Sequence, residues 1–441
     1  NGIGSVAGVE RARRAGMRVD ITDHHLPGPE LPEAEAVVDP NQPADRSGLV
    51  HLAGVGVVFL LMVGLRAALR EAGRFRARGR EEPNLADLLD LVALGTVADV
   101  VPLDHANRLL VHQGLRRIRS GRCQPGIAAL AEIGGRRLDR LGEDDLGYIV
   151  GPRLNAAGRL DDMGLGISCL VADDPSAARG AAQRLDELNR ERRSIERRME
   201  EEALETLGEL DLESKLAELP AALCIWDADW HQGVVGILAS RLKERLHRPV
   251  IAFAPGDDGE LRGSARSVEA VHIRDAIENV ANRRPGLVPR FGGHAMAAGL
   301  SLAQDRFDEF RRELEAEVER IYPVDERRGT VRTDGELEAG DIGLDLAREI
   351  RQGGPWGRAF PQPRFDGRFE VVGRRVVGGR HLKLQLRPEG GRNVVDAIAF
   401  RHGDREWPDG EHTVEAVYRL EVDDYRGVER FQLVVRNLRV V

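Results

Sequence analysis

Apolar positions in the first part of the chain alternate between strand and helix periods. Up to about residue 171, short apolar strands are expected at residues 19–22 and 36–38, and helical runs at residues 52–69 and 85–94. A second alternating unit covers about residues 221–322. Its expected strands are residues 222–226 and 250–254, with a helix at residues 233–246 between them. The pattern predicts two α/β units.

A long helical pattern separates these units. Residues 175–210 hold apolar side chains at helical spacing, charged residues elsewhere and no internal proline, which predicts one connecting helix. We expect its charged faces to be solvated rather than to bind nucleic acid. The apolar positions are Leu185, Leu188, Ile195 and Met199.

From residue 330 the pattern changes to strands separated by turn residues. Five antiparallel strands of this length predict a small barrel. We therefore expect an α/β protein with domains at residues 1–174, 213–326 and 327–441, and the connecting helix at residues 175–212. The barrel strands are expected at residues 367–377, 381–387, 394–400, 412–422 and 431–441.

Composition narrows the class of protein. The longest apolar run, residues 52–65, is shorter than the ~18 residues of a membrane span, and it predicts a buried helix. We expect no signal peptide before this run. Cys123, Cys169 and Cys224 are far apart and in no paired spacing, which favours reduced thiols in a cytoplasmic protein.

Charge argues against a protein that coats nucleic acid. The net charge is −9, whereas sequence-independent binding depends on basic residues that neutralise phosphate. Nearly all basic residues are arginines, which are better bidentate partners for phosphate than lysines, although a GC-rich genome explains the bias equally well. The chain begins with Asn1 and a turn before a helix, so we expect that a preceding strand has been removed.

The stretch "RVDITDHHLPG" ends a short strand with three polar residues. Asp23, His24 and His25 offer one carboxylate and two imidazoles, a set suited to Mn²⁺, although adjacent histidines also occur in ordinary loops. In "LLDLVALGTVADVVPLD", Asp99 lies in apolar sequence, where an ionised carboxylate needs a partner or a metal. The alternative for Asp99 is a carboxylate that caps a helix end. Together the two motifs favour a shared metal centre.

Three further motifs combine glycine or other small residues with anion-binding side chains. They are "GPRLNAAGRLDD", "GSARS" and "FGGHAMAAGL". Each alone would be a structural turn, but beside a metal site they indicate phosphoester chemistry. The candidate residues are Arg153, Asn155, Arg159, Ser264, Arg266, Gly292, Gly293 and His294.

The motifs "TDHHLP", "LVALGTVADVVPL", "GPRLNAAGRLDDM", "WHQGVVGILASR" and "FGGHAMAAGLSL" occur in the order found in a known family. Over nearly its whole length the chain resembles the DHH/DHHA1 phosphoesterase superfamily, and within it the bacterial RecJ exonucleases. The resemblance implies a parallel-sheet DHH domain, a DHHA1 α/β domain and an OB-fold barrel.

The resemblance also implies an activity. It implies a single-strand-specific 5′-to-3′ exodeoxyribonuclease of recombination and repair that releases 5′-mononucleotides by two-metal hydrolysis. It implies a monomer that binds single-stranded DNA and no membrane, with single-strand-binding protein and a recombination helicase as partners. Two Mn²⁺ or Mg²⁺ ions would be held by Asp23, His24, His25 and Asp99. The DNA 5′ end and scissile phosphate would be held by Arg159, Ser264, Arg266 and His294, supported by Asn155 and Gly293.

The chain departs from the family at its start. The family's upstream aspartate motif and the aspartate before Asn1-Gly2 are absent, so we expect impaired activity. Two alternatives stay open: a phosphodiesterase for short oligonucleotides or cyclic dinucleotides, and a non-catalytic single-strand binder. The binder would stack bases on the barrel aromatics Phe369, Tyr418, Tyr425 and Phe431.

Overall fold

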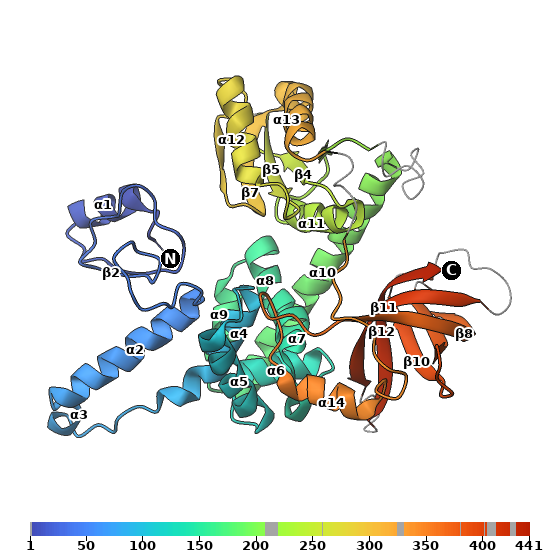
Figure 1. Ribbon diagram of the computed structural model, residues 1–441. Helices are drawn as coiled ribbons and strands as arrows, with labels where there is room; N and C mark the ends of the chain where they lie inside the picture. The colour runs from blue at the N-terminus through green and yellow to red at the C-terminus, as the bar shows by residue number, and fades with distance from the viewer. Residues whose placement is uncertain are drawn as a thin grey trace. The chain divides into compact units, whose positions relative to one another are not determined.

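The computed structural model describes residues 2–207, 219–257, 259–323, 330–379, 381–400, 402–403, 412–423 and 429–441 (Figure 1). Its contacts divide the chain into two compact units. Unit 1 comprises Asn1–Gly151, Leu170–Pro175 and Val331–Val441, and unit 2 comprises Pro152–Cys169 and Ser176–Thr330.

A two-stranded parallel sheet lies near the start of unit 1. Helix α1 (Val6–Arg14) precedes β1 (Asp20–Thr22), which pairs in parallel with β2 (Ala36–Val38). In the register, Thr22 lies opposite Val38, so both strands end at one edge of the sheet. Both strands lie where the sequence predicts them, and any polar residues that follow them are brought together at that edge.

Helices make up most of the remainder of this part of the chain. They are α2 (Gly54–Glu71), α3 (Arg74–Ala77), α4 (Leu89–Ala98), α5 (His105–Arg119), α6 (Pro125–Ile133) and α7 (Glu143–Asp145), with the 3₁₀ helices η1 (Leu85–Leu88) and η2 (Leu138–Arg140) and the π-helix η3 (Leu146–Val150). Helices α4 and α5 approach closely at Gly114, where a Cβ would lie only 2.2 Å from the Leu89 carbonyl oxygen. A glycine is therefore required at that contact.

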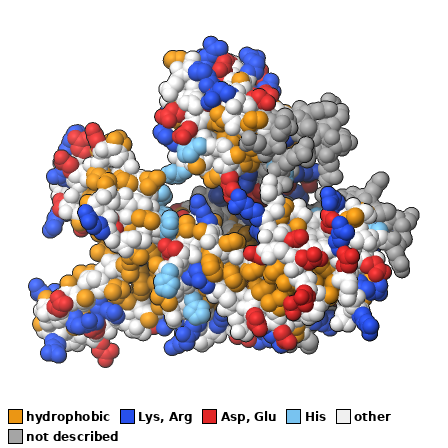
Figure 2. Space-filling view, viewed as in Figure 1, with side chains coloured by type: hydrophobic (Ala, Val, Ile, Leu, Met, Phe, Trp, Pro, Cys, Tyr) orange, Lys and Arg blue, Asp and Glu red, His pale blue; other side chains and the backbone are white. Residues whose placement is uncertain are grey.

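The expectation that α2 is buried is wrong within unit 1. Its neighbours there, β1, α3, η1 and α4, cover only part of the helix, and hydrophobic side chains gather on its exposed face (Figure 2). Among the described residues, no helix is both long enough and apolar enough to cross a membrane. The exposed apolar side chains of α2 are Val58, Leu60, Leu61 and Leu65.

The C-terminal part of unit 1 is a closed five-stranded barrel in the order β10-β12-β11-β8-β9, preceded by α14 (Leu344–Gly353). The predicted strands are present, but the pairing is not all antiparallel, because β10 and β12 run parallel where the barrel closes. The strands are β8 (Phe365–Val377), β9 (His381–Pro388), β10 (Val395–Ala399), β11 (Thr413–Asp423) and β12 (Arg430–Val440).

The barrel aromatics are mainly core residues. Phe369 and Tyr418 are fully buried and pack edge to face, and Phe431 is partly buried against the same core. Tyr425 lies outside the described residues. Phe369 and Tyr418 are therefore closed to stacking with bases, which weakens the binder alternative.

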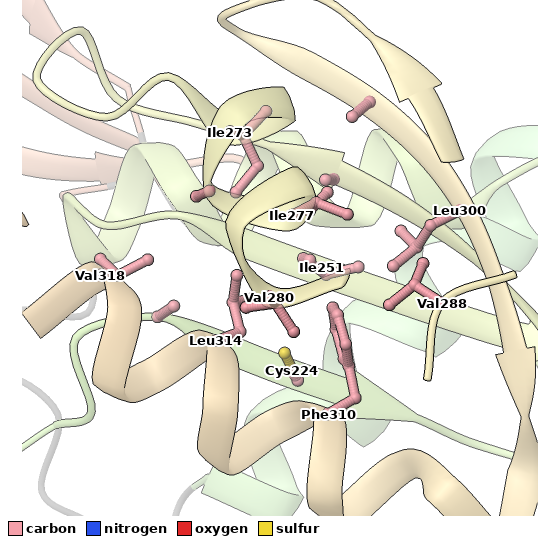
Figure 3. Packing of buried hydrophobic residues seen from close by; sticks show 14 of the residues in the cluster. Cys224, Ile251, Ile273, Ile277, Val280, Val288, Leu300, Phe310, Leu314 and Val318 are labelled. Atoms are coloured by element: carbon pink, nitrogen blue, oxygen red, sulfur yellow. The ribbon is translucent and has the colours of Figure 1, made fainter. Parts of the chain in front are cut away.

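Unit 2 contains a five-stranded sheet in the order β3-β4-β5-β7-β6 between two helical layers. The core between the sheet, α12 and α13 is shown in Figure 3, and a second core joins the other face to α10 and α11. The strands are β3 (Leu223–Trp226), β4 (Val250–Pro255), β5 (Glu260–Arg266), β6 (Arg290–Gly293) and β7 (Ala297–Ala303). The helices are α8 (Gly151–Leu160), α9 (Gly164–Val171), α10 (Pro175–Leu207), α11 (Val235–Leu246), α12 (Ile273–Arg283) and α13 (Phe307–Ile321), with the turn η4 (Gln304–Arg306) before α13.

Candidate metal centre and phosphate-binding site

Asp23 is a buried anchor at the carboxyl end of β1. Its Oδ2 accepts hydrogen bonds from the backbone N–H groups of Gly2 and Ile3, at 2.7 and 2.8 Å. Its Oδ1 accepts one from the His24 backbone N–H and one from the His25 ring, both at 2.7 Å. Burial alone would raise the pKa of this carboxyl, but the hydrogen bonds outweigh burial and hold the pKa well below its usual range. Asp23 is therefore ionised and orients His25.

The bond to Asp23 assigns the two nitrogens of the His25 ring. With an ionised carboxylate beside Nδ1, that nitrogen carries the proton and donates a hydrogen bond to Asp23 Oδ1. Nε2 then keeps a lone pair. A carboxylate behind the ring is the arrangement that commonly orients a metal-binding histidine.

His24 and Asp99 meet although they are far apart in the sequence. The His24 Nε2 atom lies 3.4 Å from the Asp99 Oδ2 atom. Asp99 is the C-cap residue of α4, and its side chain is 43% exposed. The expectation of a carboxylate inside apolar surroundings is wrong, because α4 ends at Asp99 and leaves its carboxylate at the surface. The structure nevertheless brings Asp99 to the strand-end histidine.

The loop after Asp99 is held by a segment that precedes the barrel. Val100 has a left-handed φ of 57°, which is strained for a β-branched residue. The Leu103 N–H donates to the carbonyl oxygen of Arg358 at 2.7 Å, and Gly357 lies directly against the Leu103 side chain. This support holds the turn that follows the candidate ligand.

Asp39 is a candidate site residue that the sequence reasoning missed. It directly follows β2, as Asp23 follows β1, and this shared position was the available signal. Its Oδ1 accepts the Asn41 N–H at 2.8 Å, while its Oδ2 is buried with no hydrogen-bond partner. Burial raises the pKa of Asp39, and the charge of Asp23 adds to this effect. A buried carboxylate oxygen without a hydrogen-bond partner needs a bound cation or a proton to offset the cost of its burial.

A second cluster lies in unit 2, on β5 and α11. The Arg266 Nη1 atom donates to the Ser264 hydroxyl at 3.0 Å and to the Ala265 carbonyl at 2.8 Å. Gly236 of α11 faces this pair, and a Cβ there would lie 2.9 Å from both the Arg266 Nη2 atom and the Ser264 Oγ atom. The residues of "GSARS" up to Arg266 lie on a strand, so the expectation of a turn is wrong for them.

Arg159 brings a second positive charge to this cluster. Partial desolvation lowers the pKa of Arg266, and the charge of Arg159 lowers it further. Arg159 donates to the Gly233 carbonyl at 2.7 Å, just before α11. "GPRLNAAGRL" forms helix α8 rather than the turn expected for it alone, and it places Asn155 on an exposed position. Two positive charges that affect each other in this way make the cluster a candidate site for an anion.

The "FGGHAMAAGL" motif forms a β-hairpin of β6 and β7 beside this cluster. Ala297 of β7 lies opposite Arg266, so the turn at His294 adjoins the end of β5. Gly293 has a φ of 143°, and a Cβ there would lie 2.4 Å from the Ala297 carbonyl oxygen. The His294 N–H donates to the Ala297 carbonyl at 2.8 Å, so the hairpin itself uses this donor. The imidazole of the exposed His294 is the group left to contact an anion.

Helix α10 carries a stripe of buried polar side chains, so the expectation of solvated charges is wrong for this face. Asp186 accepts a hydrogen bond from Arg153 Nε at 3.0 Å, and Arg192 Nη1 donates to Glu196 at 2.8 Å. Glu196 also pairs with Arg241 of α11. The stripe ties α8 and α11 to α10, and its members are Asp186, Asn189, Arg192 and Glu196.

A metal cluster is not complete in the part of the chain that the structure describes. No group of three or more histidine, cysteine, aspartate or glutamate side chains is arranged there to hold an ion. His24 and Asp99 form a pair, with His25 beside His24 at 4.3 Å between ring centroids.

Comparisons with known proteins match each of the three regions. The profile of the DHH family N-terminal domain matches residues 1–96, that of the DHHA1 domain residues 218–320, and that of the RecJ OB domain residues 333–437. The single-stranded-DNA-specific exonuclease RecJ of Dickeya dadantii is 53% identical over 439 residues, which cover 99% of this chain and 76% of the relative. The Escherichia coli protein of the same name is 50% identical over the same shares.

Solved structures show the same likeness. The structure of RecJ from Thermus thermophilus in complex with Mn²⁺ superposes with a TM-score of 0.78 at 29% identity, and it covers all of this chain and 60% of that one. A manganese-bound exonuclease RecJ superposes with a TM-score of 0.57 at 32% identity, over 75% of this chain and 76% of that one.

Proposed function

The chain belongs to the RecJ family of single-stranded-DNA-specific exonucleases, and on this premise we propose that it hydrolyses single-stranded DNA with divalent metal ions. The observation that carries the proposal is the approach of His24 Nε2 to Asp99 Oδ2 at 3.4 Å, beside His25. A protein that only binds nucleic acid has no use for this pair.

The residues present suit a hard divalent cation. Carboxylate oxygens and imidazole nitrogens are ligands of Mn²⁺, and solved relatives hold Mn²⁺ or Mg²⁺. We propose His24, His25 and Asp99 as ligands. The buried, unpartnered Oδ2 of Asp39 adds negative charge beside them. Asp23, which the sequence assigned as a ligand, already accepts five hydrogen bonds and serves here to orient His25.

The chain's own residues prepare the reaction in two ways. When bound, the ions supply activation of the attacking water and stabilisation of charge on the scissile phosphate. Asp23 holds His25 in one tautomer, which leaves Nε2 directed away from the anchor. In unit 2, Arg266 and Ser264 bind phosphate oxygens, with Arg159 as a second cation and His294, Asn155 and Gly293 in supporting positions. Charge-assisted bonds of this kind fix the orientation of a phosphate.

The finer features of the activity are part of the proposal. We infer 5′-to-3′ polarity, 5′-mononucleotide products, a role in recombination and repair, and two ions in the complete site. Because the described residues bring few ligands together, we also infer weaker turnover than that of the relatives. Single-strand-binding protein and a recombination helicase are the proposed protein partners of a monomer that binds no membrane. The three free cysteines fit a cytoplasmic location.

A nuclease assay that compares two histidine variants, one inside the candidate site and one outside it, tests the proposal. Single-stranded DNA labelled at its 5′ end is incubated with the chain and Mn²⁺, with duplex DNA as the negative control and Escherichia coli RecJ as the positive control. His24→Ala is expected to abolish turnover, whereas replacement of the exposed His105 at the start of α5 by alanine is expected to leave it unchanged. Equal turnover of the His24→Ala variant and the unmodified chain contradicts the assignment, and release of label from duplex alone contradicts the function.

A further inference from the structure

A cavity of about 670 Å³ lies in unit 2 and takes no part in the proposed chemistry. Its volume is within the ~300–1,000 Å³ that is usual for ligand sites. Its walls come from β3, the start of α13, the loop before α11 and the last part of α10. Neither Arg159 nor Arg266 lines it, so the cavity is separate from the phosphate cluster.

The cavity runs along the edge of β3. This strand is the first in the order of the sheet, and among the described residues only β4 pairs with it. Cys224, Ile225 and Trp226 all line the cavity. Side chains of consecutive strand residues point to opposite faces of a sheet, so three in a row line one cavity only where it meets the edge of the strand.

The backbone of β3 leaves hydrogen-bonding groups unpaired at this edge. The Leu223 N–H donates to the Pro249 carbonyl at 2.9 Å, so Leu223 and Ile225 direct their backbone groups towards β4. The N–H and C=O groups of Cys224 and Trp226 therefore point away from β4. No residue within the described ranges makes a hydrogen bond to them. An edge of this kind is a template for another strand.

The walls of the cavity combine an indole ring with unbalanced negative charge. Trp226 is partly exposed, and Asp227 and Asp305 are exposed carboxylates of the same lining. No arginine or lysine of the described chain is within salt-bridge distance of either carboxylate. Arg311 is the one cation of the described lining, and Asp308 pairs with it at 3.0 Å. Carboxylates beside an indole favour a cationic side chain and repel the phosphates of nucleic acid.

We propose that the edge of β3 and this cavity bind an extended, basic segment of a partner protein. The segment adds a strand to the sheet through the outward backbone groups of Cys224 and Trp226. An arginine or lysine side chain of the segment enters the cavity, against the Trp226 indole and near the carboxylates of Asp227 and Asp305. The site uses neither the metal centre nor the phosphate cluster, so it does not depend on the proposed function.

The test measures binding of a fluorescent peptide to the chain in low-salt buffer, where exposed charges are screened least. The probe alternates threonine and arginine over about six residues, the usual length of a strand. Asp227→Asn and Asp305→Asn are each expected to raise Kd about two- to fivefold, as for exposed ion pairs. Trp226→Ala should raise Kd at least about twofold. The matched control is Glu244→Gln, which removes an exposed carboxylate of α11 outside the cavity and should leave Kd unchanged.

Two altered peptides separate strand addition from simple attraction of charges. Proline at two neighbouring central positions keeps most of the positive charge but removes backbone donors, and it should weaken binding at least about tenfold. Glutamate in place of every arginine should abolish binding. If the proline peptide binds as tightly as the parent peptide, strand addition is wrong and the proposal is overturned.

The protein variants give a second way to refute the site. Equal Kd values for Asp305→Asn, Asp227→Asn and Glu244→Gln would exclude the cavity, and the absence of peptide binding to the unmodified chain would overturn the proposal outright. Thermal unfolding checks that each variant remains folded. Trp226→Phe is the second substitution at that position, because it keeps a ring against α13 and should retain most of the binding.

Discussion

Replacing Gly236 by alanine is expected to disable the phosphate cluster of unit 2 without unfolding it. The added Cβ would lie 2.9 Å from both Arg266 Nη2 and Ser264 Oγ, against the ~3.5–4 Å of ordinary contact. The guanidinium must therefore move by about half an ångström or more, away from the Ser264 hydroxyl. A charge-assisted hydrogen bond from this guanidinium to a phosphate oxygen of the substrate, once lost, costs about 1.5–3 kcal/mol of transition-state binding. This corresponds to a loss of about 10- to 150-fold in kcat/KM.

The assay compares turnover and binding of single strands with and without a 5′-phosphate. The variant should lose most of its preference for the phosphorylated strand, whereas its melting temperature should change little, because the displaced atom ends a flexible side chain. Gly180→Ala on α10 is the matched control, since no atom lies within 4 Å of the added Cβ there. If kcat/KM of Gly236→Ala equals that of Gly180→Ala, Arg266 and Ser264 do not bind the phosphate and the reasoning is refuted.

Three other predictions follow from single contacts. Gly357→Ala would place a Cβ 2.7 Å from Leu103 Cδ1, so we expect it to lower the free energy of unfolding by about 1–3 kcal/mol. It should also weaken Mn²⁺ binding measured by calorimetry. Unchanged Mn²⁺ affinity would show that this segment does not support Asp99. The hydrogen bond from Arg320, the largest of several, lowers the pKa of Glu317 from 4.5 to about 2, below its unfolded value. The ionised Glu317 carboxylate therefore contributes its full stabilisation of the fold above pH 4.5, and this stabilisation is lost as pH falls towards 2. Glu317→Gln should accordingly lower the free energy of unfolding in urea more at pH 7 than at pH 3. An equal loss at both pH values would contradict this. Asp39→Asn should raise the melting temperature by removing a buried charge and should lower Mn²⁺ affinity; unaltered affinity would remove Asp39 from the metal site.

Local pattern was enough to predict most elements of the fold. The strand at Ala36–Val38 begins and ends where alternation predicts, and α10 begins at Pro175 as the charged and apolar spacing indicates. The five barrel strands agree with their predicted ranges to within two residues at either end. Side-chain periodicity and turn residues act over a few residues, so they are readable without knowledge of the rest of the chain.

The candidate site was predictable as a set of residues and not as an arrangement. The strand-end position of Asp23 and His24 follows from the short strand before them, and the same rule applied to β2 would have found Asp39. That Asp99 meets His24 could be inferred only from the need of each group for a partner. The exposure of the Asp99 side chain could not be inferred, because it depends on where α4 ends and on the strained turn at Val100.

By itself, then, the sequence determined which segments are helix or strand, the two α/β units with a barrel, and the motifs that indicate phosphoester chemistry. Tertiary structure alone decided that β10 and β12 close the barrel in parallel and that α10 buries its polar stripe. Each of these depends on the partner that a side chain or strand meets from a distant part of the chain. Burial and charge pairing arise only when such partners pack together, and no local period encodes them.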